Sequence, residues 1–349
     1  MSAEQIINES LTDSIINNTE RVLVTGADGM LGSSVCRELL QQGFQVRAFV
    51  ISTKNNYLID GLGIEIVVGN ILDRSALETH MQGCSYVINI AALTNVWPRK
   101  SEKVMNVNLQ GALNVAEIAE KLKLKRMVQI GTASSFEAGS KQDPGVETGS
   151  YDGDKFGMDY IKSKYLAQEA LVKKHRESGF PVIIINPTFM IGPFDSGPSS
   201  GKMILEFYKG KVPAYTAGGK NFVASRDVAT AAVNALKLGA LGECYIAGNE
   251  NLSFGEFFKK IERVTGKSFR MFQVPNFVLY LFGMINSTFA RLTGKAPQIS
   301  YTMARLAACG QYYSSKKAQE ELNMPQTPIE EAIQQCLNWF FENGYLKKS

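Results

Sequence analysis

The chain has 349 residues, a small net charge of +4 and an ordinary globular composition, with 45% hydrophobic and 20% charged residues. These values argue against a disordered or fibrous chain, and since no long basic block occurs they do not indicate a nucleic-acid-binding surface. The five cysteines are scattered without C-x-x-C spacing, and only His80 and His175 could supply an imidazole ligand. This pattern favours reduced thiols in a cytoplasmic protein and predicts no metal site.

The first twenty residues are polar and acidic, so we expect an N-terminal extension over 1–20 and not a secretory signal. No apolar run reaches the roughly 18 residues of a membrane span. The longest such run, "FVLYLFGMI" at 277–285, is expected to form a core helix, a wall of a substrate pocket, or an interfacial patch in weak contact with a membrane surface.

From residue 21 onward, short β-branched runs alternate with longer helical segments. This alternation predicts an α/β fold of the Rossmann type, a doubly wound parallel sheet covered by helices. Helices are expected between the strands, for example over 32–43 and 106–123. The predicted strands are 21–26, 45–50, 64–69, 86–92, 126–132 and 181–187.

After residue 187 the pattern changes. Residues 188–202 are dense in Gly, Pro and Ser, which is typical of a functional loop, and 221–236 predict a return to the sheet followed by a helix. The remainder is mainly helical and ends in a helix with Thr327 as its cap and Gly344 beyond its last turn. We therefore expect a Rossmann domain over 21–187 plus 222–247, and a smaller, mainly helical substrate lobe over 188–221 plus 248–349.

The first strand leads directly into Gly26, Gly29 and Gly32, spaced G-x-x-G-x-x-G before a helix. Glycines in this context let backbone N–H groups approach a pyrophosphate at the helix N-terminus, so a dinucleotide site is predicted. The second strand is followed by no acidic residue that could hold an adenosine ribose, whereas Ser52 and Lys54 could hold a 2′-phosphate. This favours NADP over NAD, although Lys54 is equally well interpreted as an ordinary loop lysine.

The spacing Tyr-x-x-x-Lys occurs twice, as Tyr151 with Lys155 and as Tyr160 with Lys164. The first pair lies among glycines and aspartates and is expected in a loop. The second lies in 158–178, which has no Gly or Pro and shows an apolar stripe near helical period. Because residues four apart on a helix share a face, only the second pair is predicted to direct phenol and ammonium at one ligand.

The glycine fingerprint and the helical Tyr160–Lys164 pair together resemble the extended short-chain dehydrogenase/reductase family, that is, NAD(P)-dependent epimerase/dehydratase proteins. The resemblance covers roughly 21–345 and includes "VVGNILD", "NIAAL", "NVNLQGALNV", "NPTFMIGP" and "GGKNFVASRDVA". It is greatest for the branch of 3β-hydroxysteroid dehydrogenases and dihydroflavonol reductases. The family usually has Asp where this chain has Asn70.

The resemblance implies that Tyr160 is the acid/base and that Lys164 binds the nicotinamide ribose and lowers the tyrosine pKa. A hydroxyl that polarises the substrate oxygen is expected from Thr132 first and Ser134 second. Asn108 matches a structural asparagine, and a catalytic relay is the other interpretation. The implied cofactor-binding residues are Gly26, Asp28, Gly29, Met30, Leu31, Gly32, Ser52, Lys54, Asn70, Ile71, Ala91, Ala92, Lys164, Pro187 and Thr188.

Three functions are compatible with this resemblance. The first is an NAD(P)-dependent reductase or dehydrogenase acting on a secondary alcohol or ketone of a fairly apolar, sterol-, terpenoid- or flavonoid-like molecule. The second is a nucleotide-sugar epimerase or dehydratase with retained NAD, for which Lys220 stands where an arginine is common. The third is a cofactor-sensing protein without catalysis. The resemblance also implies a homodimer as a common assembly, with a small-molecule substrate as the partner.

Overall fold

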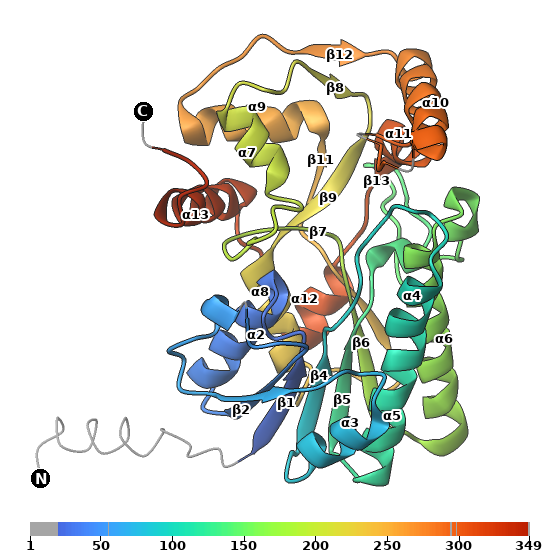
Figure 1. Ribbon diagram of the computed structural model, residues 1–349, viewed down its shortest axis with the longest axis vertical. Coiled ribbons are helices and arrows are strands. Elements are labelled where there is room, and N and C mark those ends of the chain that lie inside the picture. The colour runs from blue at the N-terminus through green and yellow to red at the C-terminus, as the bar shows by residue number, and fades with distance from the viewer. Residues whose placement is uncertain (1–19, 55, 294, 298, 348–349) are drawn as a thin grey trace, which may run out of the picture.

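The computed structural model describes residues 20–54, 56–293, 295–297 and 299–347 (Figure 1). Its centre is a sheet of seven parallel strands in the order β10-β6-β5-β4-β1-β2-β3. The expected N-terminal extension lies almost entirely outside the described residues. The strands are β1 (Arg21–Thr25), β2 (Gln45–Val50), β3 (Glu65–Val68), β4 (Tyr86–Asn89), β5 (Arg126–Ile130), β6 (Val182–Pro187) and β10 (Cys244–Ala247).

Alternate side chains of each strand face two helical layers. Val22 and Val24 of β1 belong to the apolar core on one side, and Leu23 belongs to the core on the other. Both faces of the sheet are therefore covered, which confirms the doubly wound α/β fold and the six predicted strands. The first layer holds α2 (Met30–Gln41), α8 (Ser225–Asn234) and α12 (Lys316–Leu322), and the second holds α3 (Arg74–Met81), α5 (Gly111–Lys121) and α6 (Asp159–Ser178).

The strand order reverses between β1 and β4, because the chain proceeds outward from β1 on one side and returns to β4 on the other. In open α/β sheets, ligands bind at the carboxyl ends of the strands beside such a reversal. The connection after β4 holds α4 (Glu102–Met105), which continues through a π-helical turn at Asn106–Gln110 into α5. Short 3-10 turns lie at Asn56–Leu58, Ala133–Ser135 and Gly153–Phe156.

A second lobe stands over this edge of the sheet (Figure 1). It contains a four-stranded sheet, in which β9 pairs with β11, β13 and β7, and a two-stranded sheet of β8 and β12. The strands are β7 (Phe189–Ile191), β8 (Ala214–Thr216), β9 (Gly219–Ala224), β11 (Glu250–Ser253), β12 (Phe272–Val274) and β13 (Gly310–Gln311), and the helices are α7 (Lys202–Tyr208), α9 (Phe254–Thr265), α10 (Asn276–Thr293), α11 (Tyr301–Ala308) and α13 (Ile329–Glu342).

Two local predictions differ from the structure. The strand predicted near residue 221 does not rejoin the main sheet, since β9 belongs to the small sheet and β10 makes the return. A short alternating run does not say which sheet will pair with it. Thr327 does not cap α13 either, because its hydroxyl donates to the buried carboxylate of Asp227 at 2.7 Å. Gly344 does follow the helix with φ +77°.

Candidate active site

In the glycine turn after β1, the backbone lies very close to neighbouring parts of the protein. Gly26 has φ +64°, and a Cβ there would lie 2.9 Å from Cα of Ala91, at the end of β4. A Cβ on Gly32 would overlap the carbonyl oxygen of Gly26, because the first turn of α2 packs directly on the end of β1. Gly29, the exposed N-cap of α2, has no atom nearer than 3.5 Å to such a Cβ. The first and third glycines are therefore required by packing, and the free N–H groups of α2 face open space.

A cavity of about 450 Å³ extends from this turn to the start of α6. It runs along the carboxyl ends of β1, β4, β5 and β6, the position expected for a dinucleotide. Most of the implied cofactor residues line it. These are Gly26, Asp28, Gly29, Met30, Leu31, Gly32, Ala91, Ala92, Lys164, Pro187 and Thr188.

Four implied cofactor residues lie outside this lining, beyond the ends of β2 and β3. The Ser52 hydroxyl oxygen accepts from the Lys54 N–H at 3.2 Å, and the Lys54 side chain is exposed. The Asn70 side chain accepts from the Leu72 N–H at 3.0 Å, which closes its own turn. Ile71 is buried in the core beneath α5.

Tyr160 and Lys164 lie one turn apart at the start of α6. The helix entry is anchored by Asp159, whose carboxylate accepts from the Ser101 N–H at 2.8 Å and from the Lys100 ammonium at 3.0 Å. Lys164 is only 4% exposed, and its Nζ donates to the carbonyl oxygen of Ile130 at 2.7 Å. Burial lowers the pKa of Lys164 to about 8. This ammonium is therefore fixed to the end of β5, close to where the cavity narrows toward Tyr160.

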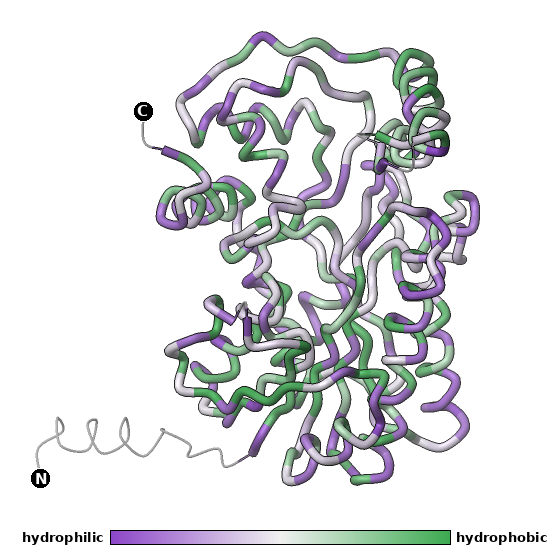
Figure 2. Tube along the Cα trace, in the orientation of Figure 1, coloured by the Kyte–Doolittle hydropathy of each residue, from purple (hydrophilic) through white to green (hydrophobic). Residues whose placement is uncertain are grey.

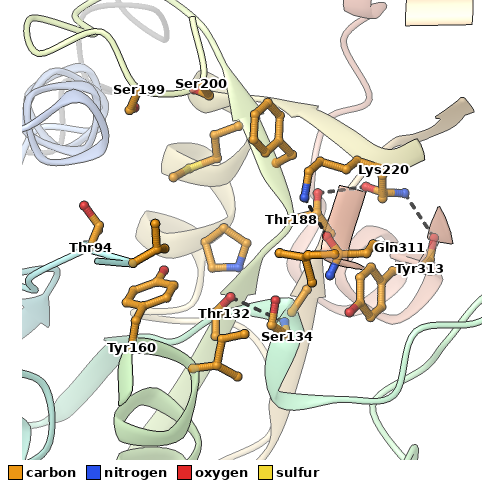
Figure 3. A pocket seen from close by; sticks show the side chains of 18 of the residues that line it. Thr94, Thr132, Ser134, Tyr160, Thr188, Ser199, Ser200, Lys220, Gln311 and Tyr313 are labelled. Carbon is orange, nitrogen blue, oxygen red and sulfur yellow. Dashed lines mark hydrogen bonds between the residues drawn. The ribbon is translucent and has the colours of Figure 1, made fainter. Parts of the chain in front are cut away.

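Thr132 is the hydroxyl that meets Tyr160 (Figure 3). Burial raises the pKa of the Tyr160 phenol, and the hydrogen bond from Thr132 partly opposes this rise. Ser134 does not line this cavity; its backbone N–H donates to the Thr132 hydroxyl oxygen at 3.3 Å (Figure 3). Burial raises the pKa of Tyr313, and the Ser134 hydroxyl partly opposes that rise. The geometry therefore favours Thr132 over Ser134 as the partner of the phenol.

The first Tyr-x-x-x-Lys pair is engaged elsewhere. The Tyr151 ring stacks on Tyr165 with 3.8 Å between centroids, and its hydroxyl lies 3.3 Å from a carboxylate oxygen of Asp154. Lys155 forms an ion pair with Asp152. Neither Tyr151 nor Lys155 lines the cofactor cavity, nor a second cavity on the other side of Tyr160 that is described below.

Asn108 sits in the π-helical turn and uses its amide inside the protein. Its Nδ2 donates to the Leu93 carbonyl oxygen at 3.0 Å and to the Ser163 hydroxyl at 3.1 Å, and its Oδ1 accepts from the Leu93 N–H at 2.8 Å. It thereby ties the loop after β4 to α6. These contacts favour the structural interpretation of Asn108 over a catalytic relay.

Three buried polar residues that the sequence analysis did not single out lie behind Lys164. The Thr25 hydroxyl donates to Asn89 Oδ1 at 2.6 Å, and Asn89 Nδ2 donates to Gln129 Oε1 at 2.8 Å. Gln129 Nε2 then donates at 2.9 Å to the Ile130 carbonyl that also accepts from Lys164. All three lie at or next to the last position of an observed strand, whereas the predicted strands placed Asn89 and Gln129 three residues before their ends.

A second cavity of about 450 Å³ opens on the other side of Tyr160, between the two lobes. Its wall includes Tyr160, Thr132, Pro187 and Thr188, all of which also line the first cavity. The rest of the wall is largely apolar. The contributing apolar residues are Met30, Val96, Ala133, Met158, Ile161, Phe189, Met190 and Leu306. Polar side chains also reach the cavity, and they are Thr94, Ser134, Ser199, Ser200, Lys220, Asn221, Gln311 and Tyr313.

Lys220 of β9 is the cation in this second cavity. Its Nζ donates to Gln311 at 2.5 Å and lies 5.1 Å from the centre of the Phe189 ring (Figure 3). Burial lowers the pKa of Lys220 to about 8. Gln311 and Tyr313 come from the C-terminal segment, which the sequence analysis assigned to the substrate lobe without naming site residues.

The fold, the glycine cradle and the adjoining Tyr160–Lys164 helix define a dinucleotide-binding enzyme of the Rossmann type. The chain matches the NAD dependent epimerase/dehydratase family over residues 22–248, and it therefore belongs to that family. It is an NAD(P)-dependent oxidoreductase of the extended short-chain dehydrogenase/reductase type.

The chain is 32% identical to a putative dihydroflavonol 4-reductase of Synechocystis sp., over 93% of this chain and 95% of that protein. It is 27% identical to sterol demethylase protein B of Methylococcus capsulatus, over 93% and 99% of the two chains. Among solved structures it resembles gox2253, with 29% identity, a TM-score of 0.83 and coverage of 94% and 100%. The UDP-glucose 4-epimerase of Thermus thermophilus shares the fold, with 19% identity, a TM-score of 0.73 and coverage of 92% and 98%.

Replacing Gly32 by alanine should abolish NAD(P)H binding or lower its affinity at least tenfold, because the new Cβ must displace the turn that approaches the pyrophosphate. Gly255→Ala in α9 is the control, since it also adds one Cβ but lies outside both cavities and comes no nearer than 3.0 Å to a neighbouring atom. Titration with NADPH, followed by fluorescence, measures both. Equal affinities for the two variants would contradict the assigned role of the turn.

Proposed function

We propose that this enzyme transfers hydride reversibly between NADP(H) and a secondary alcohol or ketone of a fairly apolar small molecule, with Tyr160 as the acid/base. One observation supports this most directly. Tyr160 and Thr132 both lie on the wall that the two cavities share, near enough for the Thr132 hydroxyl to oppose the rise that burial causes in the phenol pKa. Groups on such a wall can touch a substrate oxygen in one cavity while the reduced ring of a cofactor occupies the other.

The bound nicotinamide would supply or accept the hydride. In the reducing direction, Tyr160 would donate its hydroxyl proton to the substrate carbonyl oxygen, and Thr132 would donate a hydrogen bond to the same oxygen. Lys164, one turn further along α6, would contact the cofactor ribose and favour the phenolate left after the proton transfer. The carbonyl thus gains a hydride and a proton, and oxidation reverses both transfers.

The apolar part of the substrate would lie against the largely apolar wall of the second cavity. Names of relatives agree with this class: dihydroflavonol 4-reductase, sterol demethylase protein B and, at 23% identity over 84% of its length, a 2-alkyl-3-oxoalkanoate reductase of Shewanella oneidensis. Sterol-, terpenoid- and flavonoid-like ketones are therefore the first compounds to screen.

Tyr160→Phe should lower kcat at least 1,000-fold while NADPH affinity changes less than about threefold, because only the proton donor is removed. Tyr151→Phe is the control and should retain the wild-type rate, since its ring lies outside both cavities. Steady-state kinetics on a ketone found by screening, with NADPH titration, tests this. A Tyr160→Phe variant that keeps its activity would refute the role.

The preference for NADP rests on Ser52 and Lys54, which stand beyond the end of β2 beside an exposed surface. Lys54→Ala should weaken NADPH binding about tenfold and leave NADH binding unchanged, because only NADPH has a 2′-phosphate for the ammonium. Competitive titration with both nucleotides measures the change. Equal losses for NADPH and NADH would remove the basis for the preference.

The positive charge of Lys220 indicates which charged group the substrate carries. Its side chain is half-buried in the wall of the second cavity, and its hydrogen-bond partner is the neutral amide of Gln311. A partly buried cation without an anionic partner is costly, and a bound anion would remove that cost. We infer that the substrate has one anionic group, such as a carboxylate, beside its ketone.

Tetradecanoate should therefore bind the NADPH-loaded protein at least tenfold more tightly than 1-tetradecanol, and Lys220→Met should remove the difference. The preference should be present below pH about 8 and fall above it, since Lys220 must be protonated to attract the anion. Quenching of bound NADPH fluorescence reports binding without turnover. Equal binding of acid and alcohol to the wild type would exclude an anion site at Lys220.

A nucleotide-sugar epimerase with retained NAD is the second candidate, and the fold shared with UDP-glucose 4-epimerase is what favours it. Denaturing the purified protein and identifying any released nucleotide separates the two functions, since only the epimerase needs stoichiometric, non-exchanging NAD. A cofactor sensor is the third candidate, but it has no need of Tyr160, Thr132 and Lys164 together. The homodimer and the cytoplasmic location stay predictions.

A further inference from the structure

Helix α10, at the edge of the second lobe, exposes a broad apolar surface (Figure 1). Its large apolar side chains range in exposure from 41% for Val278 to 81% for Leu292. The run is coloured hydrophobic along much of the helix in Figure 2. We call this set the α10 apolar surface: Phe277, Val278, Leu281, Phe282, Met284, Ile285, Phe289 and Leu292.

One narrow side of α10 is packed, and it is the side with small residues. Leu279, Gly283 and Ala290 are buried. A Cβ on Gly283 would lie 2.9 Å from the Ala304 side chain, so α10 crosses α11 at close range. The helix thus packs on the lobe through Leu279 and the small residues Gly283 and Ala290. Its largest apolar side chains are exposed.

Scattered exposed apolar residues need no explanation, but a contiguous set of eight on one helix marks a binding surface. Of the three expectations for the segment, the core helix is wrong because most of these side chains are exposed. A wall of the substrate cavity does not describe it either, since none of the eight lines that cavity. The interfacial patch is the expectation that fits.

The charges around α10 indicate what it contacts. The sequence has no Asp or Glu between Glu262 and Glu320, while Arg291 lies on α10, Lys295 follows it, and Arg305 lies on α11, which packs against α10. In the part of the chain that the structure describes, none of these three cations belongs to an ion pair. Arg291 of α10 also shares a groove with Arg99 and Lys100 from the loop after β4. Lys100 is paired with Asp159, whereas Arg291, Lys295 and Arg305 belong to no ion pair among the described residues, and cations beside an apolar surface match an anionic partner.

We propose that the α10 apolar surface docks on the headgroup region of an anionic lipid bilayer. An amphipathic helix with cations beside its apolar face lies in the plane of the interface, and both burial and attraction to anionic lipid contribute to its binding. Within the described residues no helix is long and apolar enough to cross a bilayer. A second copy of the chain is a poorer occupant, because symmetric pairing through α10 would bring like-charged flanks together.

The surface also lies next to the substrate cavity. Helix α11, which packs under α10, supplies Leu306 to the wall of that cavity. Docking would therefore place a side of the cavity near the bilayer, where apolar molecules partition. The docking itself does not depend on the proposed reaction.

The test is co-sedimentation of the full-length protein with extruded vesicles, either pure phosphatidylcholine or phosphatidylcholine with about a third phosphatidylglycerol. We expect at least tenfold stronger binding to the anionic vesicles, and a decrease as salt is raised. The double variant Leu281→Glu with Ile285→Glu should lose this binding. Leu238→Glu with Leu241→Glu is the matched control, because it adds the same charge at exposed leucines far from α10 in sequence, and it should bind as the wild type does.

A third variant, Arg291→Gln with Lys295→Gln, keeps the apolar face and should lose only the preference for anionic vesicles. NADPH titration of every variant verifies that the cofactor site is intact. Failure of the wild type to bind anionic vesicles above the level of the Leu281→Glu/Ile285→Glu variant would overturn the proposal. So would light scattering that shows a dimer which this double variant converts to a monomer, since a second copy would then cover the surface.

Discussion

The site depends on a buried chain of hydrogen bonds that crosses the carboxyl ends of three neighbouring parallel strands. It runs from Thr25 through Asn89 and Gln129 to the Ile130 carbonyl oxygen, where Lys164 donates from the opposite side. A buried lysine is tolerated only where its ammonium has fixed acceptors. Because β1, β4 and β5 are adjacent, one row of polar side chains at their ends can satisfy one another and hold α6 in place.

The same strand ends explain why the two cavities meet where they do. The glycine turn allows α2 to approach β1 closely, which leaves the cofactor cavity open along the sheet edge. β6 ends at Pro187 and Thr188, after which the chain enters the second lobe, so these residues belong to both cavities. Tyr160 at the start of α6 completes that common wall. The proposed chemistry would therefore take place at the junction between the Rossmann sheet and the second lobe.

The two lobes differ in the surroundings of their positively charged side chains. In the first lobe the buried Lys164 donates to the backbone carbonyl oxygen of Ile130, whereas Lys220 in the second donates to the side-chain amide of Gln311 beside an apolar wall. Further out, α10 places large apolar side chains beside cations that have no acidic neighbours in the sequence. Both features suit amphiphilic molecules with an apolar body and an anionic group. Lys220 lies in the cavity next to the second lobe, and the α10 apolar surface lies on the outside of the same lobe.

The sequence by itself determined the parallel α/β fold, the glycine turn and the helical placement of Tyr160–Lys164 but not of Tyr151–Lys155, because each depends on local periodicity and on glycine or proline at fixed offsets. Only the tertiary structure decided that β9 joins the small sheet, that Thr327 binds Asp227, and that Gln311 and Tyr313 reach the cavity. Each of these depends on which distant segments pack together, and local patterns do not encode such pairing. The structure likewise decided that Thr132 lines both cavities with Tyr160 while Ser134 lines only the second, since the short 3-10 turn after β5 gives neighbouring hydroxyls different positions.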